Sequence, residues 1–362
     1  MKACILSVVD LSRMSMAMIY TDYFKKHGIS CDMIFVDKYN EYTENVPENY
    51  IPLHTKSRQE YSTLKKVAIF WGLRKTVRRI LREKQYDLVV VWNEVTAFLF
   101  GNLLIKEGYG GRYIINIRDY QHLDAPVVKG RLKKAIDKSR FTTVSSSEYI
   151  KYLPEHDYLF IHSLNRAVVG KLERKDKKTG GPIVIMYIGQ IGWLENTFSF
   201  VDALADDPDF ILRFVGVGAE KVAEYAKEKG YKNVQTHGKF KPDETADFLA
   251  EADIIYNLYG YGNKHLDDAL SIKLYYAIYL GIPILAYDDT FTNKVAKECG
   301  IAYTVHGTEN MKSELKELAG WYRDLDIAKA REKCDSFIRS QIEKSHADFE
   351  RSLDEFRMQY DK

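Results

Sequence analysis

The sequence predicts an α/β protein built from two Rossmann-like, doubly wound parallel sheets in tandem that face each other across a cleft. Its 362 residues exceed the roughly 250–300 that one core usually supports, so two domains are expected. Short runs rich in Val and Ile alternate with amphipathic segments in both halves, which is the pattern of βαβ units. A polar stretch without apolar periodicity, Asn165–Pro182, separates the halves and indicates a linker.

In the first half, five apolar runs are expected to form buried parallel strands. They are Ala3–Val9, Cys31–Val36, Leu88–Trp92, Tyr113–Ile117 and Phe141–Val144. The third run is continuously hydrophobic, as a strand covered on both faces must be. A helix over Leu64–Lys84 is predicted to precede it.

The second half repeats the alternation. Its predicted strands are Ile183–Ile188, Phe210–Val215, Asp253–Leu258, Ile282–Ala286 and Ile301–Thr304, with helices near Thr197–Ala205, Ala219–Lys229 and Asp243–Ala252. The charged segment Ile327–Tyr360 is predicted to be helical and to pack along one or both domains.

Composition and charge restrict the classes of partner and compartment. The chain is 46% hydrophobic and 29% charged, and its net charge of +2 argues against nucleic acid as a main partner. The four cysteines form no C-x-x-C pair and predict reduced thiols, not a zinc site or a disulfide scaffold. The N-terminal apolar run predicts a first strand and not a signal peptide, and Leu88–Ile105 is too interrupted to span a membrane. We therefore expect a cytoplasmic protein.

The segment from Ser271 to Ala286 predicts a capped helix followed by a buried strand. The hydroxyl of Ser271 can cap the first backbone N–H groups, and Gly281 can end the helix in a left-handed conformation. A lysine in the first turn, Lys273, opposes the helix dipole unless an anion lies nearby. The sequence therefore predicts a phosphate near Lys273, with a solvated lysine on an ordinary helix as the alternative.

Glycine turns follow the first two predicted strands of the second half and the short run Val234–Thr236. They are Gly189-Gln190-Ile191-Gly192, Gly216-Val217-Gly218 and His237-Gly238-Lys239. Ligands of open parallel sheets bind at the carboxyl ends of the strands, and glycine lets backbone approach a ligand closely. The three turns together predict a binding edge, although each one alone is as easily an ordinary tight turn.

In this order the segments resemble the GT-B glycosyltransferases, in particular the bacterial enzymes similar to glycosyltransferase family 4 that build surface polysaccharides. The resemblance spans nearly the whole chain and is clearest from Ile183 to Thr304. It implies a second domain that holds a nucleotide-diphosphate sugar, a first domain that holds the acceptor, and a C-terminal helix that crosses back. The implied parts are an N-terminal domain over 1–168, a linker over 169–182, a C-terminal domain over 183–340, and a helix over 341–362 that packs on the N-terminal domain.

The resemblance also implies which residues bind the donor. By position they are Gly189, Gln190, Gly192, Gly216, Gly218, Lys239, Ser271, Lys273 and Tyr276. Backbone N–H groups and Lys273 would stabilise the charge that builds on the departing diphosphate without a metal. No isolated Asp-x-Asp is present to hold a metal, so we expect no metal and no cofactor besides the donor substrate.

Two departures from the family pattern change these expectations. Tyr276 stands where relatives carry a glutamate that binds the ribose hydroxyls. The single oxygen of a phenol cannot accept hydrogen bonds from two neighbouring hydroxyls as a carboxylate does. The Arg and Lys pair that commonly follows the first glycine turn is missing, so phosphate binding depends more on Lys273, with Lys239 or Lys264 as further candidates. Asp268 is expected to contact the donor sugar or the acceptor; alternatively, it is a carboxylate that favours a helix N-terminus.

On the acceptor side, the loop after Tyr113–Ile117 collects Arg118, Asp119 and His122 at a strand's carboxyl end. His122 or Asp119 could serve as the base of an inverting enzyme, whereas the retaining chemistry that the resemblance implies needs no protein nucleophile. Arg118 and Arg13 are the expected acceptor-binding residues, and Arg13 suits an acidic or pyrophosphate-linked acceptor. The alternative for this loop is simple solvation.

The predicted helix Leu64–Lys84 is basic and amphipathic, with Phe70 and Trp71 among its apolar residues. Its cations are Lys65, Lys66, Arg74, Lys75, Arg78, Arg79, Arg82 and Lys84. The pattern predicts either peripheral contact with an anionic membrane or an ordinary packing helix with a solvated face.

Together these observations predict a hexosyltransferase-like enzyme of class EC 2.4 that transfers a sugar from a nucleotide-diphosphate donor to a glycan or lipid-linked acceptor in capsule or surface-polysaccharide assembly. Two alternatives stay open. One is a nucleotide-sugar epimerase of the same architecture, and the other is a non-catalytic subunit that binds a sugar nucleotide.

Overall fold

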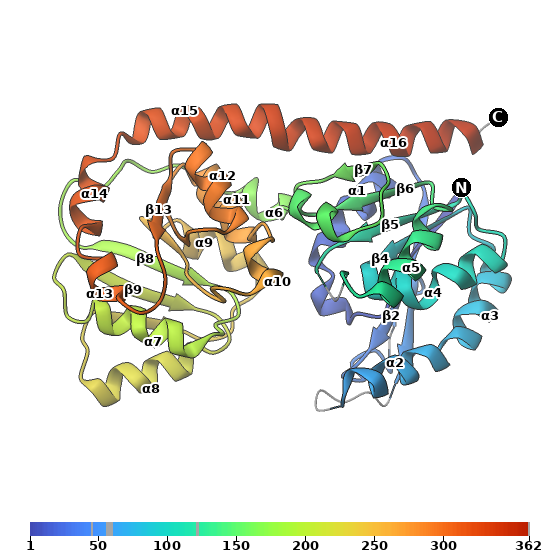
Figure 1. The fold of residues 1–362 in the computed structure, drawn as a ribbon, viewed down its shortest axis with the longest axis horizontal. Helices are drawn as coiled ribbons and strands as arrows, with labels where there is room; N and C mark the ends of the chain where they lie inside the picture. Colours follow the sequence, from blue (N-terminus) through green and yellow to red (C-terminus); the bar gives the residue numbers. More distant parts are fainter. Residues whose placement is uncertain (45, 56–60, 121–122, 361–362) are drawn as a thin grey trace. The chain divides into compact units, whose positions relative to one another are not determined.

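The chain divides into two compact units in its computed structural model, which describes residues 1–44, 46–55, 61–120 and 123–360. Unit 1 comprises Met1–His162 together with Ser345–Lys362, and unit 2 comprises Ser163–Lys344. Each unit is built around one wholly parallel sheet, in agreement with the predicted fold class (Figure 1).

Unit 1 holds a seven-stranded sheet in the order β3-β2-β1-β4-β5-β6-β7. Its strands are β1 (Lys2–Ser7), β2 (Ser30–Asp37), β3 (Tyr50–His54), β4 (Leu88–Trp92), β5 (Tyr113–Ile117), β6 (Phe141–Val144) and β7 (Tyr158–Phe160). The five predicted strands are confirmed. The two that were not predicted, β3 and β7, are the edges of the sheet, where burial on both faces is not required and the hydrophobic run is lost. Pro52 lies in β3, as an edge strand allows.

The main helices of unit 1 are α1 (Met18–Lys26), α2 (Thr63–Gly72), α3 (Arg74–Lys84), α4 (Glu94–Lys106), α5 (Pro126–Ile136) and α16 (Lys344–Tyr360). The prediction of a single helix over 64–84 is wrong, because the chain forms two helices that meet at Leu73. The first ends at Gly72, a residue that disfavours helix continuation.

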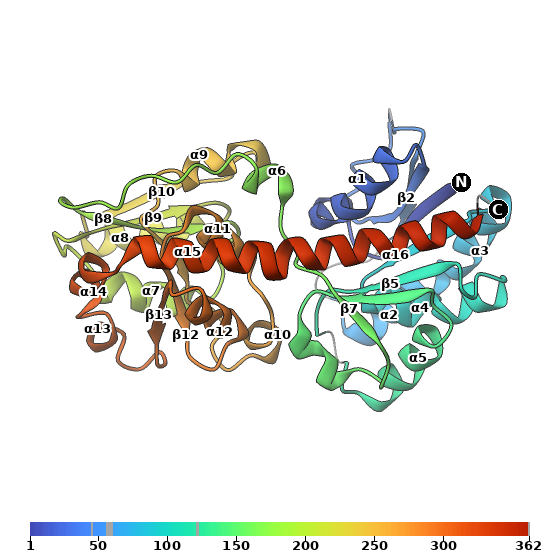
Figure 2. The same cartoon turned by 90° about the horizontal axis from the view of Figure 1, so that it is seen from above.

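Helix α16 joins unit 1 from the far end of the sequence (Figure 2). Phe349, Leu353 and Phe356 form its buried stripe, and the ring of Phe349 lies edge-on to that of Tyr20 in α1 with centroids 5.0 Å apart. The Tyr23 hydroxyl donates a hydrogen bond of 2.8 Å to the Asp354 carboxylate. Together with α15 (Ile327–Phe337) and a π-helical turn at Ile338–Glu343, α16 confirms the predicted C-terminal helical segment.

Unit 2 holds a six-stranded sheet in the order β10-β9-β8-β11-β12-β13. Its strands are β8 (Ile183–Ile188), β9 (Phe210–Val215), β10 (Val234–His237), β11 (Ile254–Asn257), β12 (Ile284–Tyr287) and β13 (Ala302–Val305). Along β8, Ile185 and Tyr187 face one apolar core, whereas Met186 and Ile188 face a second. Both faces of the sheet are therefore covered, as a parallel sheet requires.

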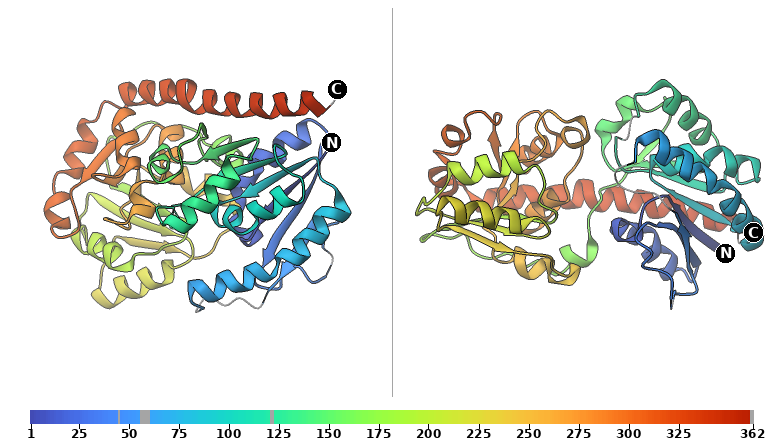
Figure 3. Two further views of the ribbon diagram at one scale, coloured as in Figure 1. Left: turned by 45° about the vertical axis from the view of Figure 1, so that its right-hand side comes forward. Right: turned by 90° about the horizontal axis from the view of Figure 1, so that it is seen from below.

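Helices of unit 2 cover the two faces separately (Figures 1 and 3). One core includes residues of α7 (Leu194–Ala203), α8 (Ala219–Lys229), α13 (Met311–Glu314) and α14 (Leu318–Asp324). The other includes residues of α6 (Arg166–Val169), α9 (Thr245–Leu249), α11 (Ile272–Leu280), α12 (Phe291–Glu298) and α15. A short helix, α10 (Lys264–Asp267), precedes α11.

The polar stretch before β8 is held to unit 2 by ion pairs. The ammonium groups of Lys175 and Lys178 lie 3.0 and 3.2 Å from the carboxylate of Asp253, which is 1% exposed. The same carboxylate accepts a hydrogen bond of 2.9 Å from the Val184 N–H in β8. The stretch is therefore attached to unit 2 by charged side chains as well as by Val168 and Val169, which lie in its apolar core.

Within the described part of the chain, every helix is too short or too polar to cross a lipid bilayer.

Candidate functional site

Lys273 lies in the first turn of α11, at the carboxyl edge of the unit 2 sheet. The residue is only 7% exposed. Its ammonium group sits over the rings of Tyr187 and Tyr259, 4.7 and 4.4 Å from their centroids. Among the described residues no carboxylate pairs with it. A largely desolvated cation with only aromatic partners is an electrostatic cost that a bound anion would offset.

The start of α11 is capped as the sequence predicts. Ser271 is the N-cap, and its Oγ accepts a hydrogen bond of 3.3 Å from the Lys273 N–H. The hydroxyl of Tyr259 lies 3.0 Å from the same Oγ, so the cap and one aromatic wall around Lys273 are joined. Gly281 closes the helix at φ 61°, as expected. Lys273 is therefore held at a helix N-terminus, where the dipole also favours negative charge.

The turn after β8, residues 189–193, presents open space. Gly189 has φ +116°, a conformation that side chains rarely adopt, and no atom lies within 4 Å of where its Cβ would be. At Gly192, likewise, no atom lies within 4 Å of where a Cβ would be. Gln190 is exposed between them, while its carbonyl accepts a hydrogen bond of 3.0 Å from the Tyr187 hydroxyl. These three predicted donor residues thus lie together on an accessible turn.

Gly216 and Gly218, in the turn after β9, face backbone instead. A Cβ on Gly216 would overlap the carbonyl of Gly189, and a Cβ on Gly218 would lie 2.5 Å from the carbonyl oxygen of Ile191. Both also have positive φ, +135° and +98°. The structure gives these two glycines a packing reason, namely the close approach of two neighbouring turns.

The other two predicted donor residues, Tyr276 and Lys239, differ in burial. Tyr276 belongs to the apolar core around α11 and is 6% exposed, so its ring is used in packing. Lys239 is exposed on the turn after β10, at the sheet edge, and makes no ion pair with any described residue.

Asp268 is the C-cap of α10, half-buried and hydrogen-bonded to Lys264 through its backbone N–H. The alternative prediction, a carboxylate at a helix N-terminus, is therefore wrong, because Asp268 follows a helix end. Burial, and next the charge of Asp268, raise the pKa of the neighbouring Asp267 to about 6.

Asn257, at the carboxyl end of β11, was not predicted as a site residue. It is 9% exposed, and its Oδ1 is buried without a hydrogen-bond partner in the described part of the chain. It lines a small pocket with Tyr259, Ser271 and Tyr287. The signal in the sequence was a polar residue that ends an otherwise apolar strand.

On unit 1, the predicted acceptor residues follow two strands at the carboxyl edge. Arg118 and Asp119 come directly after β5, and the Arg118 guanidinium lies 5.1 Å from the Trp92 ring. Arg13 is exposed in a 3-10 turn that Asp10 caps after β1. The third catalytic candidate, His122, lies outside the described residues.

Glu94 was not predicted as a site residue from the sequence. It is 1% exposed at the start of α4, and its Oε2 accepts hydrogen bonds from the backbone N–H groups of Arg118 and Asp119, at 3.2 and 3.3 Å. Its other oxygen, Oε1, is buried without a partner among the described residues. Burial, and next the charge of Asp119, raise the pKa of Glu94 to about 8. The carboxyl group is therefore neutral at pH 7 and holds the predicted acceptor loop in place.

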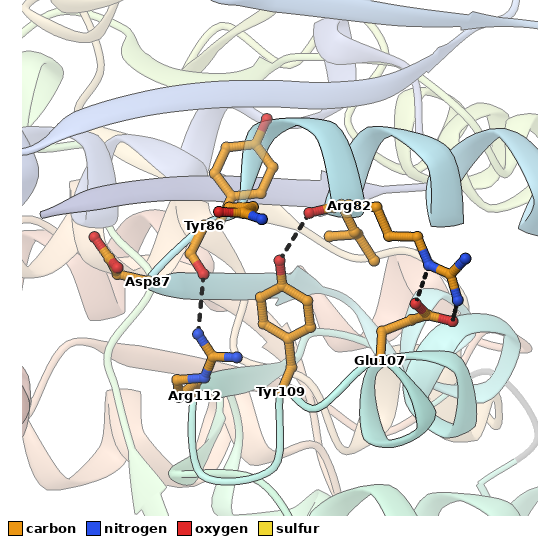
Figure 4. Close-up of a pocket in the computed structure, with 8 residues that line it drawn as sticks. Arg82, Tyr86, Asp87, Glu107, Tyr109 and Arg112 are labelled. Atoms are coloured by element: carbon orange, nitrogen blue, oxygen red, sulfur yellow. Dashed lines mark hydrogen bonds and ion pairs between the residues drawn. The ribbon is translucent and has the colours of Figure 1, made fainter.

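A further pocket of unit 1 lies at the opposite, amino edge of the sheet, beside the starts of β4 and β5 (Figure 4). Its polar groups bond to one another: Arg82 pairs with Glu107 at 2.6 Å, and Tyr109 donates to the Leu81 carbonyl at 3.1 Å. Arg112 donates to two backbone carbonyls. Because ligands of parallel sheets bind at the carboxyl ends, this pocket is not the site.

The chain resembles known proteins in sequence over part of its length and in fold over nearly all of it. Residues 169–340 match the family described as glycosyl transferases group 1. The fold is similar to that of a sucrose-phosphate synthase from Thermosynechococcus elongatus, with a TM-score of 0.70, 10% identity and 99% of each chain covered.

Two further solved structures share the fold. The lipopolysaccharide outer core galactosyltransferase WaaB has a TM-score of 0.60 and 15% identity, with 98% of this chain and 99% of that chain covered. A UDP-GlcNAc 2-epimerase from Neisseria meningitidis bound to UDP-GlcNAc has a TM-score of 0.58 and 12% identity, with 95% and 100% covered. No curated protein matches the chain in sequence.

The contact between the two glycine turns predicts that two similar substitutions change the free energy of unfolding by different amounts. Gly216→Ala places a methyl group against the Gly189 carbonyl and should cost about 2 kcal/mol or more of unfolding free energy. Gly192→Ala enters open space and should change that free energy by no more than about 0.5 kcal/mol. Urea denaturation of both variants measures this, and equal losses would contradict the packing assigned to Gly216.

The raised pKa of Glu94 predicts a pH-dependent stability. Between its ordinary value of 4.5 and its folded value of about 8, the unfolded chain releases this proton and the folded chain keeps it. Unfolding stability should therefore fall as pH rises through that range, by at most about 1.4 kcal/mol per pH unit. In Glu94→Gln this contribution is absent, so thermal melts of variant and wild type should diverge from pH 5 to pH 8. Parallel melting curves would rule out a buried neutral carboxyl.

Proposed function

From the GT-B fold and the match of residues 169–340 to the group 1 glycosyl transferases, we infer that this protein transfers a sugar from a nucleotide-diphosphate donor to a glycan or lipid-linked acceptor. We assign it to capsule or other surface-polysaccharide assembly, with retention of configuration and without a metal. The resemblance to surface-glycan enzymes supports this assignment. The proposed location is the cytoplasm, at the inner face of the cell membrane.

The observation that carries the proposal is Lys273. A sugar leaving a nucleoside diphosphate builds negative charge on the phosphate, and a positioned cation lowers the free energy of that state. The ammonium group of Lys273 is preorganised between two tyrosine rings, at a helix N-terminus and without a carboxylate partner among the described residues. Neutralising a developing diphosphate is the chemistry that this arrangement suits.

Acceptor binding is proposed for unit 1, through Arg13 and Arg118. Both are cations at the carboxyl edge of its sheet, which suits an acceptor that carries phosphate or another acid. Asp119 is the proposed acceptor-side proton carrier and Asp268 the proposed contact to the donor sugar. His122 keeps its proposed catalytic role on the strength of the sequence alone.

A nucleotide-sugar epimerase is the second candidate, and the fold shared with UDP-GlcNAc 2-epimerases favours it. An epimerase would convert a UDP-sugar into its epimer with no acceptor present, which proton NMR of the nucleotide pool detects. A non-catalytic subunit would bind a sugar nucleotide and neither transfer nor convert it.

Peripheral membrane contact is proposed for α2. None of residues 64–72 is buried, and Leu64 and Trp71 are 83% and 40% exposed. The guanidinium groups of Arg74 and Arg131 lie 4.6 and 4.7 Å from the Trp71 ring. An exposed apolar helix flanked by cations suits the surface of an anionic bilayer, where lipid-linked acceptors reside.

Lys273→Met separates a binding role from a structural one. The methionine keeps the apolar stem and removes the charge, so the ligand-free melting temperature should stay the same or rise, because an unpaired buried cation is costly. Affinity for the nucleoside diphosphate that stabilises the wild type should fall at least about tenfold. A thermal-shift screen of UDP, GDP, CDP, ADP and their sugar conjugates, followed by calorimetry, measures both.

The matched control is Lys227→Met, which removes an exposed lysine on α8 in the same unit. It should leave affinity unchanged. Loss of stability in Lys273→Met with unchanged nucleotide affinity would refute the donor site.

Leu64→Glu tests the membrane contact. Because Leu64 is 83% exposed, the substitution should change unfolding free energy by no more than about 0.5 kcal/mol, yet it should abolish flotation with phosphatidylglycerol vesicles. Val127→Glu, at an apolar residue of α5 that is 72% exposed, should float like the wild type. Flotation of Leu64→Glu at the wild-type level, or none by the wild type, would exclude α2 as the contact.

A further inference from the structure

Trp193 combines two unusual properties. It is 49% exposed, one of the few large apolar side chains of unit 2 that are so accessible. Its backbone is left-handed, at φ 51° and ψ 50°, a conformation that is strained for a bulky side chain. A tryptophan at such a position contributes less to stability through burial than usual, and its left-handed backbone adds conformational strain. Strained, exposed residues of this kind are characteristic of functional sites.

The turn that carries Trp193 is rigid. The N–H groups of Gly189 and Ile191 donate to the carbonyls of Val215 and Val217, at 2.9 and 2.8 Å. Thr197 holds the far end of the turn. Its N–H donates to the Trp193 carbonyl, and its hydroxyl donates to the Gly192 carbonyl. The indole is thus presented from a fixed backbone, which lowers the entropy lost when a ligand binds it.

The surroundings of Trp193 are those of the proposed donor site. The open glycines 189 and 192 are in the same turn, and Tyr187, whose ring lies under the Lys273 ammonium, donates to the carbonyl of Gln190. Val217, 52% exposed on the adjoining turn, extends the apolar surface. The indole itself has no aromatic or cationic partner among the described residues.

We propose that Trp193 is a stacking platform for a ring of the nucleotide-sugar donor, either the base or the sugar. This inference rests on the proposed function and specifies it further. Both rings present an apolar face, and both are attached to the diphosphate that Lys273 would hold. An exposed indole on the turn to which Tyr187 of the cation site is hydrogen-bonded suits a ligand with a ring next to an anion. In this role Trp193 is a donor-binding residue.

The test uses tryptophan fluorescence and calorimetry on the full chain. Besides Trp193 the protein has Trp71, Trp92 and Trp321. Wild type, Trp193→Phe and the control Trp71→Phe are titrated with UDP, GDP, CDP and ADP and with their glucose conjugates. The emission change on ligand binding should persist in Trp71→Phe and be lost in Trp193→Phe. Trp193→Ala should bind the sugar nucleotide at least about tenfold more weakly than the wild type.

The bare nucleoside diphosphate tells the two rings apart. If Trp193→Ala loses affinity only for the sugar conjugate, the platform holds the sugar; if it loses affinity for both ligands, the platform holds the base. Wild-type affinity of Trp193→Ala for every ligand, with the emission change retained in Trp193→Phe, would overturn the platform and leave the proposed function standing. Absence of binding by the wild type would overturn the proposed function itself.

Trp193→Gly provides a check on folding. Glycine accepts the left-handed conformation without strain, so this variant should melt at a higher temperature than Trp193→Ala. Both should show the same loss of ligand affinity. If affinity recovered along with stability in the glycine variant, the loss in Trp193→Ala would reflect a distorted turn, and the stacking role would be refuted.

Discussion

The backbone contact between the turns after β8 and β9 is the constraint on which the carboxyl edge of unit 2 depends. Because Gly216 has no side chain, the carbonyl of Gly189 can lie directly against it. This approach constrains the path of the first turn, which carries Trp193. Tyr187, which bonds to the same turn, is also one of the two rings beside Lys273. This single close approach of backbone thus influences both the position of Trp193 and, through Tyr187, the surroundings of Lys273.

Each unit has a buried ionisable group with incomplete polar partners at the carboxyl edge of its sheet. One of these groups is a base and the other is an acid. In unit 2, Lys273 is a desolvated cation beside aromatic rings only. In unit 1, burial holds Glu94 in its neutral form, with Oε1 lacking a partner in the described part of the chain. Such groups lower the stability of the ligand-free protein, which selection tolerates where binding or proton transfer needs them.

The sequence predicted the architecture because the central strands are mostly apolar, and Leu88–Trp92 and Ile183–Ile188 are apolar throughout. The edge strands β3 and β7 were not predicted, because the edge of a sheet does not need an apolar run. Local chemistry also located Lys273, since a serine cap and a terminal glycine define a helix start. The rings around Lys273 could not be predicted, because Tyr187 and Tyr259 reach it only through the spatial order of β8 and β11. Glu94 gave no signal, because a glutamate in the first turn of a helix is normally solvated.

Unit 1 is assembled from both ends of the chain, and this has a consequence for synthesis on the ribosome. Residues 1–162 emerge first, yet Tyr20 of α1 packs against Phe349, which is made after the whole of unit 2. Unit 2 is contiguous and can complete its core while unit 1 still lacks α16. The face of α1 that packs on α16 is therefore uncovered until α16 has been translated, and unit 1 is completed only after unit 2 has been made.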